Sequence, residues 1–155
     1  MTALKRFYTR GEAPEAGFAR TATLAVAAVF LLVGILGFVP LANTDFDQLA
    51  FAGPHSDAKL LGLFTVSVLH NAVHLLFAVA GFVMARTGRL ARAYLLGGGA
   101  VYLGLWLYGL VVDEHSWANF VPVNDADDWL HLGLAAGMLL LGWFAAPGVR
   151  ERRLP

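Results

Sequence analysis

The sequence predicts an all-α membrane protein, a four-helix transmembrane bundle with its N and C termini in the cytoplasm. Two of the supporting observations concern composition. Hydrophobic residues make up 58% and charged residues 14% of the 155-residue chain, against about 45–50% and about 25% in soluble domains. The third is that apolar residues gather in four long segments whose connections differ in charge. This composition excludes a disordered chain and disfavours a soluble enzyme.

Each apolar segment approaches the roughly 20 residues that a helix needs to cross a bilayer. The predicted spans are residues 20–39, 60–85, 90–112 and 129–146. They form one transmembrane domain over residues 19–147, between a polar cytoplasmic arm (1–18) and a basic cytoplasmic tail (148–155). The length of the chain also favours a single domain.

The first two helices have recognisable ends. Pro40 is expected to end the first helix, because proline lacks an N–H and blocks continuation. A cleaved signal peptide is the alternative for this segment, but its apolar stretch exceeds the roughly 7–15 residues of a signal core. Gly53 and Pro54 predict a turn, after which Ser56 or Asp57 is expected to cap the second helix. A helix that begins there would protrude from the outer side of the bilayer.

The last two helices also have local start signals. Thr87 and Gly88 predict a tight cytoplasmic hairpin between the second and third helices. Asn124 is the expected N-cap of the fourth helix, and Asp127 follows three residues later, where a carboxylate favours the positive end of a helix.

Glycines predict where helices approach one another. Gly34 and Gly37 permit close approach to the first helix. Gly133-x-x-x-Gly137 is a small-residue packing pattern, which we expect to serve contacts inside the bundle, with a homodimer interface as the alternative.

Loop charges predict the orientation, because Lys and Arg are retained on the cytoplasmic side of a membrane. Ten of the eleven basic residues lie in the arm, the second connection and the tail: Lys5, Arg6, Arg10, Arg20, Arg86, Arg89, Arg92, Arg150, Arg152 and Arg153. The first and third connections hold Lys59 and the acidic residues Asp45, Asp47, Asp57, Asp113, Glu114, Asp125, Asp127 and Asp128. Both termini are therefore predicted to be cytoplasmic.

Polar side chains inside predicted spans are costly in lipid, so each one is a candidate functional residue. Ser67, His70, Asn71 and His74 follow the i, i+3, i+4, i+7 spacing that places them on one face of the second helix. This face is expected to meet protein or water, because lipid cannot satisfy polar groups.

The third and fourth helices offer partners for that face. Asp127 and His131 are four residues apart and share a face of the fourth helix. His70 and His131 are expected near one depth in the outer half of the membrane, and Tyr102 offers a hydroxyl that could bond one of the histidines.

The first functional hypothesis is an intramembrane metal site, zinc first. Neutral imidazoles four residues apart suit a transition metal. The candidate ligands are His70, His74 and His131, with Asp127 as a fourth ligand or as the group that orients a ligand. The supporting polar network is expected to contain Ser67, Asn71, Tyr102 and Asn124.

Three alternatives use the same residues. They could serve only as hydrogen-bond partners that lock helix packing, in a non-catalytic structural or accessory component. They could form a proton or ion pathway, which in so small a bundle requires oligomers. His70 or His74 with His131 could also ligate a b-type haem.

Other observations limit the remaining functions. The chain has no cysteine, which excludes disulfides and thiolate sites, and its formal net charge of zero gives no basic field for nucleic acid. The sequence does not decide whether the protein is an enzyme, but no Ser-His-Asp arrangement or phosphate loop is visible, which weighs against it. The expected partners are the lipid bilayer and either further copies of the chain or a membrane complex.

Three motifs together resemble a known family. They are Gly34-Ile-Leu-Gly-Phe-Val-Pro40, Leu69-His-Asn-Ala-Val-His74 and Asn124-Asp-Ala-Asp-Asp-Trp-Leu-His131. In this order and spacing they resemble the small bacterial membrane proteins catalogued as domain of unknown function 4383, over about residues 20–146. The resemblance implies a four-helix protein of the bacterial cytoplasmic membrane, and it implies no activity. The family pattern falls on His70, Asn71, His74, Asn124, Asp127 and His131, while Ala78 stands where the family often shows Gly.

Overall fold

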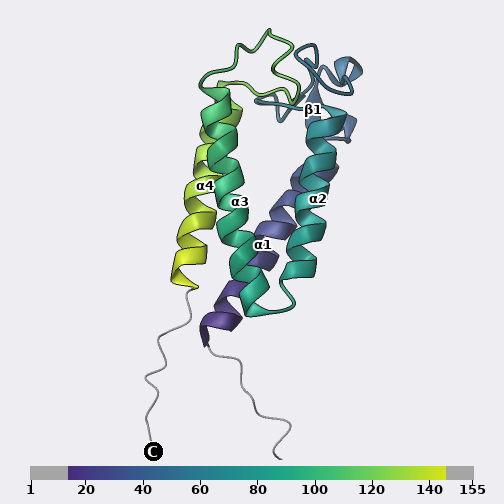
Figure 1. Ribbon diagram of the computed structural model, residues 1–155. Coiled ribbons are helices and arrows are strands. Elements are labelled where there is room, and N and C mark those ends of the chain that lie inside the picture. The colour runs from purple at the N-terminus through teal and green to yellow at the C-terminus, as the bar shows by residue number, and fades with distance from the viewer. Residues whose placement is uncertain (1–13, 146–155) are drawn as a thin grey trace, which may run out of the picture.

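A computed structural model describes residues 14–145 of the chain. Over these residues the protein is mostly helical, with four long helices that run along one axis (Figure 1). The helices are α1 (Pro14–Leu36), α2 (Val68–Met84), α3 (Gly88–Gly109) and α4 (Asp125–Phe144). The start of α1, the α2–α3 turn and the end of α4 lie at one end, which we call the terminal end; the longer connections lie at the other, the loop end.

The bundle is built from two antiparallel pairs. The tightest packing joins α1 to α2 and α3 to α4, and α1 against α3 holds the pairs together. The core between them contains Phe30, Tyr94, Leu95, Tyr102 and Met138, all buried. The predicted hairpin between the second and third helices is confirmed, because only three residues separate α2 from α3 and the Thr87 side chain accepts a hydrogen bond from the Leu90 N–H.

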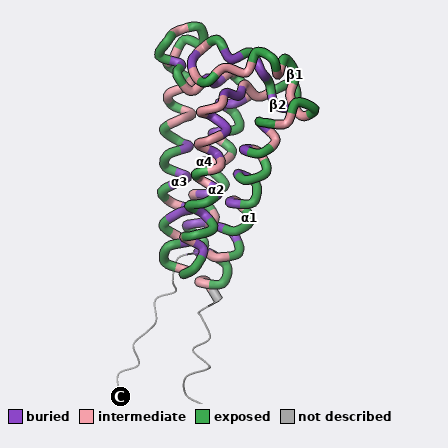
Figure 2. Tube along the Cα trace, turned by 90° about the vertical axis from the view of Figure 1, so that its right-hand side faces the viewer, coloured by how far each residue is buried: buried purple, intermediate pink, exposed green. Residues whose placement is uncertain are grey.

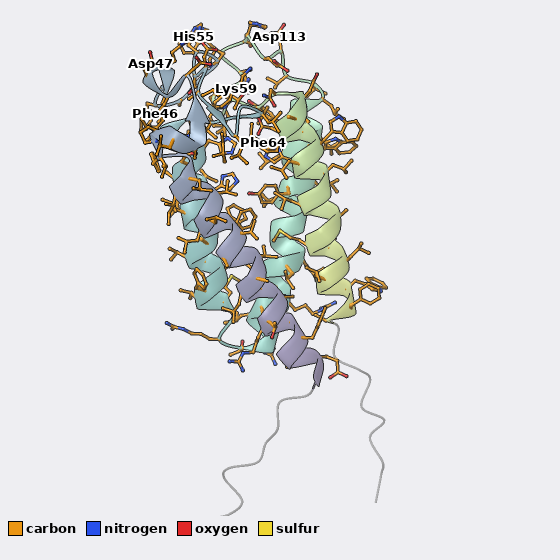
Figure 3. All side chains as sticks on the ribbon, turned by 180° about the vertical axis from the view of Figure 1, so that it is seen from behind. Phe46, Asp47, His55, Lys59, Phe64 and Asp113 are labelled. Carbon is orange, nitrogen blue, oxygen red and sulfur yellow. The ribbon has the colours of Figure 1, made fainter. Side chains whose placement is uncertain are left out.

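A small β-sheet covers the loop end. The connection from α1 to α2 contains two short 3-10 helices, η2 (Pro40–Ala42) and η3 (Phe46–Gln48), and three two-residue strands. The strands are β1 (Asn43–Thr44), β2 (Lys59–Leu60) and β3 (Phe64–Thr65), antiparallel in the order β1-β2-β3. Asn43 faces Leu60 across β1 and β2, and Leu60 faces Phe64 across β2 and β3. Figure 3 labels Phe46, Lys59 and Phe64 in this layer, away from the termini.

The second helix begins later than the sequence predicted. We expected it to begin near Asp57, but α2 begins at Val68 and has 17 residues. The intervening apolar residues pair as strands, and Leu61 and Gly62 turn the chain between β2 and β3 with positive φ angles of 53° and 71°. A short apolar run does not distinguish a strand from a helix by periodicity alone, which explains the error.

The outer faces of the helices are apolar. Exposed positions run along the helices (Figure 2). Large hydrophobic residues occupy many of them on every helix, among them Leu32, Leu76, Leu107 and Leu140. Residues Glu15–Leu36 and Gly88–Gly109 are each long and apolar enough to cross a membrane, and only 28% and 33% of their apolar windows are buried. The helix α2 is also apolar, but with 17 residues it is shorter than these two.

The glycine predictions have different outcomes. A Cβ on Gly34 would come within 2.8 Å of Leu75, so close approach there is confirmed. The expected packing of Gly133 and Gly137 inside the bundle is wrong, because both are exposed and a Cβ there would have no neighbour within 4 Å. Close approach of α3 and α4 instead uses Gly98, Gly99 and Gly142.

Candidate functional site

The three predicted histidines converge near the loop end of the bundle. His70 lies in the first turn of α2 and His74 one turn further, with their rings stacked at 4.6 Å between centroids. His131, in the second turn of α4, packs its ring against Tyr102 of α3 at 5.4 Å. Phe30 of α1 stacks on Tyr102 and touches the edge of His74, so all four helices contribute a ring.

The three histidines and Tyr102 line a small cavity of about 30 Å³. Its walls are His70, Val73, His74, Tyr102, Leu105, Tyr108, Val121, Val123 and His131. About 10–15 Å³ is enough to hold a water molecule, so the cavity has room for one small polar guest.

Two histidines bring unused nitrogens to the cavity. Within residues 14–145, neither Nδ1 of His70 nor Nδ1 of His131 has a hydrogen-bond partner, although the two residues are only 6% and 3% exposed. A buried imidazole nitrogen without a partner is costly, and a water or an ion commonly satisfies such groups.

The protonation pattern of His74 follows from its neighbour. Its Nδ1 lies 3.0 Å from the carbonyl oxygen of His70. A carbonyl can only accept, so Nδ1 carries the proton and donates to it. Nε2 of His74 is therefore the nitrogen that keeps a lone pair for a proton or a metal ion.

Asp127 has a different place from the one expected of a metal ligand. Its Oδ2 accepts from the backbone N–H of Asn124 at 3.1 Å and from that of Thr65 at 3.0 Å. The Asn124 side chain in turn accepts from the Asp127 N–H, so the predicted N-cap is confirmed, and the two residues form a capping box. Burial raises the pKa of Asp127 to about 7, although the two backbone N–H groups act in the opposite direction.

The zinc hypothesis is not supported by this arrangement. Among residues 14–145, no group of three or more His, Cys, Asp or Glu side chains is placed to hold a metal ion. The histidines and Asp127 are near one end of the bundle, but the carboxylate is engaged in the cap of α4.

The supporting polar residues are held by hydrogen bonds between elements. Ser67 is the N-cap of α2, where its hydroxyl accepts from the His70 N–H at 3.1 Å. Asn71 Nδ2 donates to the Gly37 carbonyl at 2.8 Å and so joins α2 to the end of α1. Asn124 Nδ2 donates to Thr65 Oγ1 and to the Leu63 carbonyl, at 2.9 and 3.0 Å. Tyr102, expected to offer its hydroxyl, meets His131 through its ring.

Sequence reasoning missed the residues that cover the histidines. Val123 lines both the histidine cavity and a polar cavity of about 250 Å³ at the loop end, which Asp57, Lys59 and Glu114 help to line. Asn119 holds this segment, because its Oδ1 accepts from the Val123 N–H at 3.2 Å. No spacing rule in the sequence singles out Asn119 or Val123, and Phe30 had no signal beyond its apolar character.

Comparison with known protein families places the chain in a family. The family model described as Domain of unknown function (DUF4383) matches residues 20–144. No curated protein and no solved structure is similar to the chain.

Proposed function

The chain belongs to the family described as Domain of unknown function (DUF4383), and from its own site we propose that it is a non-catalytic, four-span protein of the bacterial cytoplasmic membrane. In this proposal both termini are cytoplasmic. The elements at the terminal end (Figure 1) carry Arg20, Arg86, Arg89 and Arg92, and those at the loop end carry Lys59 with the acidic residues of the connections. This separation of charge supports the orientation.

We propose that hydrogen bonds from the polar side chains fix the β1-β2-β3 sheet and its turns, which we call the strand layer, to the ends of the helices; we call this set of bonds the lock. The observation that carries this is the Asp127 carboxylate, which accepts at once from Thr65 in β3 and Asn124 at the start of α4. One buried side chain therefore joins segments that are 62 residues apart. A loop end held rigid in this way suits an accessory component of a larger membrane complex or a homo-oligomer. On α4, the exposed Gly133 and Gly137 offer a face for close contact with another helix.

Replacing Asn124 with alanine tests this lock. Asn124→Ala removes the cap and both bonds to the strand layer, so we expect a loss of about 1–2 kcal/mol in stability. Limited proteolysis in detergent should then cut the connection between α1 and α2 faster than in the wild type. Asp125→Ala is the matched control, because Asp125 is exposed in the same helical turn. Equal cleavage of the two variants would remove the support for a lock.

A second candidate function is a guest site at the histidines. The unpartnered Nδ1 atoms of His70 and His131 on one cavity support it. The guest would be a water, a proton in transit or, after side-chain rearrangement, a metal ion with His70, His74 and His131 as ligands.

Elemental analysis separates these guests. Near-stoichiometric zinc in purified protein that disappears in His70→Ala/His74→Ala would support the metal. Metal-free protein would exclude it, and proton flux into liposomes that His70→Ala abolishes would then support the pathway. Asn119→Ala is the control for indirect effects, because Asn119 shapes the covering segment and carries no imidazole.

A further inference from the structure

A second cavity lies at the terminal end, away from the histidines. It has a volume of about 490 Å³, within the roughly 300–1,000 Å³ of small-molecule sites. The first turn of α1, the start of α3 and the residue after α4 form its walls, with Glu15, Ala16, Arg89, Arg92, Leu96 and Ala145 among them. The cavity therefore opens where three helix ends meet, in the region that the proposed orientation places at the cytoplasmic surface (Figure 1).

The charge of this cavity favours an anion. The lining contains two arginines, Arg89 and Arg92, and one carboxylate, Glu15. Its net charge is therefore +1. Arg92 is held in place because its Nε donates to the Gly142 carbonyl at 3.0 Å. This bond uses one of the five N–H donors of the guanidinium, and Arg89 is exposed at the rim. Arginine is well suited to phosphate because its planar fork can donate two parallel hydrogen bonds.

An apolar groove adjoins the charged cavity. It has a volume of about 370 Å³ and lies between α2 and α3, whose packing is loose. Phe77, Ala80 and Met84 form one wall and Gly97 and Val101 the other. Ala93 lines both the groove and the charged cavity, so the two meet on α3. From Ala93 to Val101 the helix rises about 12 Å, which is the direction and scale of a lipid chain that enters the membrane.

We propose that the two cavities together bind one anionic phospholipid, with its phosphate head at Arg89 and Arg92 and an acyl chain in the groove along α3. Neither the charged cavity nor the apolar groove alone identifies this ligand. A soluble phosphate would not need the groove, and a neutral lipid would not need two arginines. Basic pockets between helices on the cytoplasmic side of membrane proteins are suited to such head groups. The proposal rests on the proposed membrane location of the chain.

Lipid-dependent stability of the full-length protein in detergent tests the head-group half. Phosphatidylglycerol should raise the apparent melting temperature, while phosphatidylcholine and soluble glycerol phosphate should not. Arg89→Gln should require about fivefold more phosphatidylglycerol for the half-maximal shift. Arg86→Gln is the matched control, because Arg86 is exposed in the adjoining turn and does not line the cavity. Equal responses of the two variants, or of the two lipids, would overturn the proposal.

A second pair of variants tests the groove. Gly97→Leu adds a side chain at a residue that lines the groove, and its Cβ would meet no described atom within 4 Å. Gly104→Leu is its control, because Gly104 is equally open on the same helix and lies outside the groove. Gly97→Leu should weaken the phosphatidylglycerol response and Gly104→Leu should not; the same response in both would overturn the acyl-chain site. These assays are done in detergent and do not depend on the orientation of the chain in a membrane. Their failure is therefore distinguishable from a failure of the proposed orientation.

Discussion

At the scale of single residues, Asp127 shows how one side chain can satisfy a local rule and a tertiary one. Three residues after Asn124 it completes the capping box of α4, and it also accepts from the Thr65 N–H of the strand layer. The local role follows from spacing, while the second bond depends on where β3 lies. Asp127 precedes the proposed fourth span (129–146), so it lies in the cap and not within the apolar segment.

The raised pKa of Asp127 predicts a pH dependence of stability. Its folded pKa of about 7 exceeds the ordinary value near 3.9. Between these values the folded state binds more protons than the unfolded state, so stability falls as pH rises toward 7 and levels off above it. The melting temperature of the wild type, taken relative to that of Asp127→Asn at the same pH, should therefore fall from pH 4 to pH 7 and stay level up to pH 8.

Asp125→Asn provides the control for that measurement, because Asp125 is exposed on the same turn. Its profile should follow the wild type. Parallel profiles for the wild type and Asp127→Asn would show that another group sets the pH dependence.

At the scale of elements, the contact between α1 and α2 depends on a glycine and an amide. Asn71 donates to the Gly37 carbonyl, and a Cβ on Gly37 would lie 2.1 Å from Asn71 Oδ1. Gly37 lies directly after α1, so the last turn of one helix meets the first turn of the next. This close approach holds α2 where its histidines can reach the cavity.

Gly37→Ala should therefore destabilise the protein by about 1–3 kcal/mol, because the added methyl displaces Asn71 and breaks its bond. Thermal unfolding in detergent measures this effect. Gly133→Ala should not destabilise the protein, since its position is open and alanine favours a helix over glycine by about 0.5–1 kcal/mol. A similar loss in both variants would indicate that glycine matters here for chain flexibility and not for packing.

For the helix α2, the sequence predicted the polar face correctly and the starting residue wrongly. Spacing identified the face of α2 that carries His70, Asn71 and His74, and all three are buried. The start of this helix was placed too early, because Ser67 is its cap and the apolar residues before it pair as strands. Helical periodicity defines a face, but a strand of two residues is fixed by its partner strand.

At the scale of the whole molecule, the two ends carry opposite chemistry. In the described residues the terminal end is basic and the loop end acidic, and exposed apolar helix faces lie between them. This arrangement predicts a definite orientation in the membrane.

Single cysteines can test the orientation, because the natural chain has none to give background labelling. In intact cells a membrane-impermeant maleimide should label His115→Cys, whose side chain is 95% exposed at the loop end. Arg86→Cys, at the terminal end, should be labelled only after permeabilisation, and the cysteine-free parent controls for other reactions. The reverse pattern would refute the orientation, and protection of both sites until permeabilisation would refute exposure of the loop end to the outside.

The sequence by itself determined the four helical segments, the cap of α4, the polar face of α2 and the sorting of charge between the ends. Each of these depends on spacing along the chain or on composition, which local rules can resolve. Only the tertiary structure decided that Phe30 and Tyr102 bring the histidines together, that Asp127 serves the strand layer and that Gly133 faces outward. These features depend on which helices are neighbours and how each is rotated about its axis, because packing selects among faces that the sequence makes equally apolar.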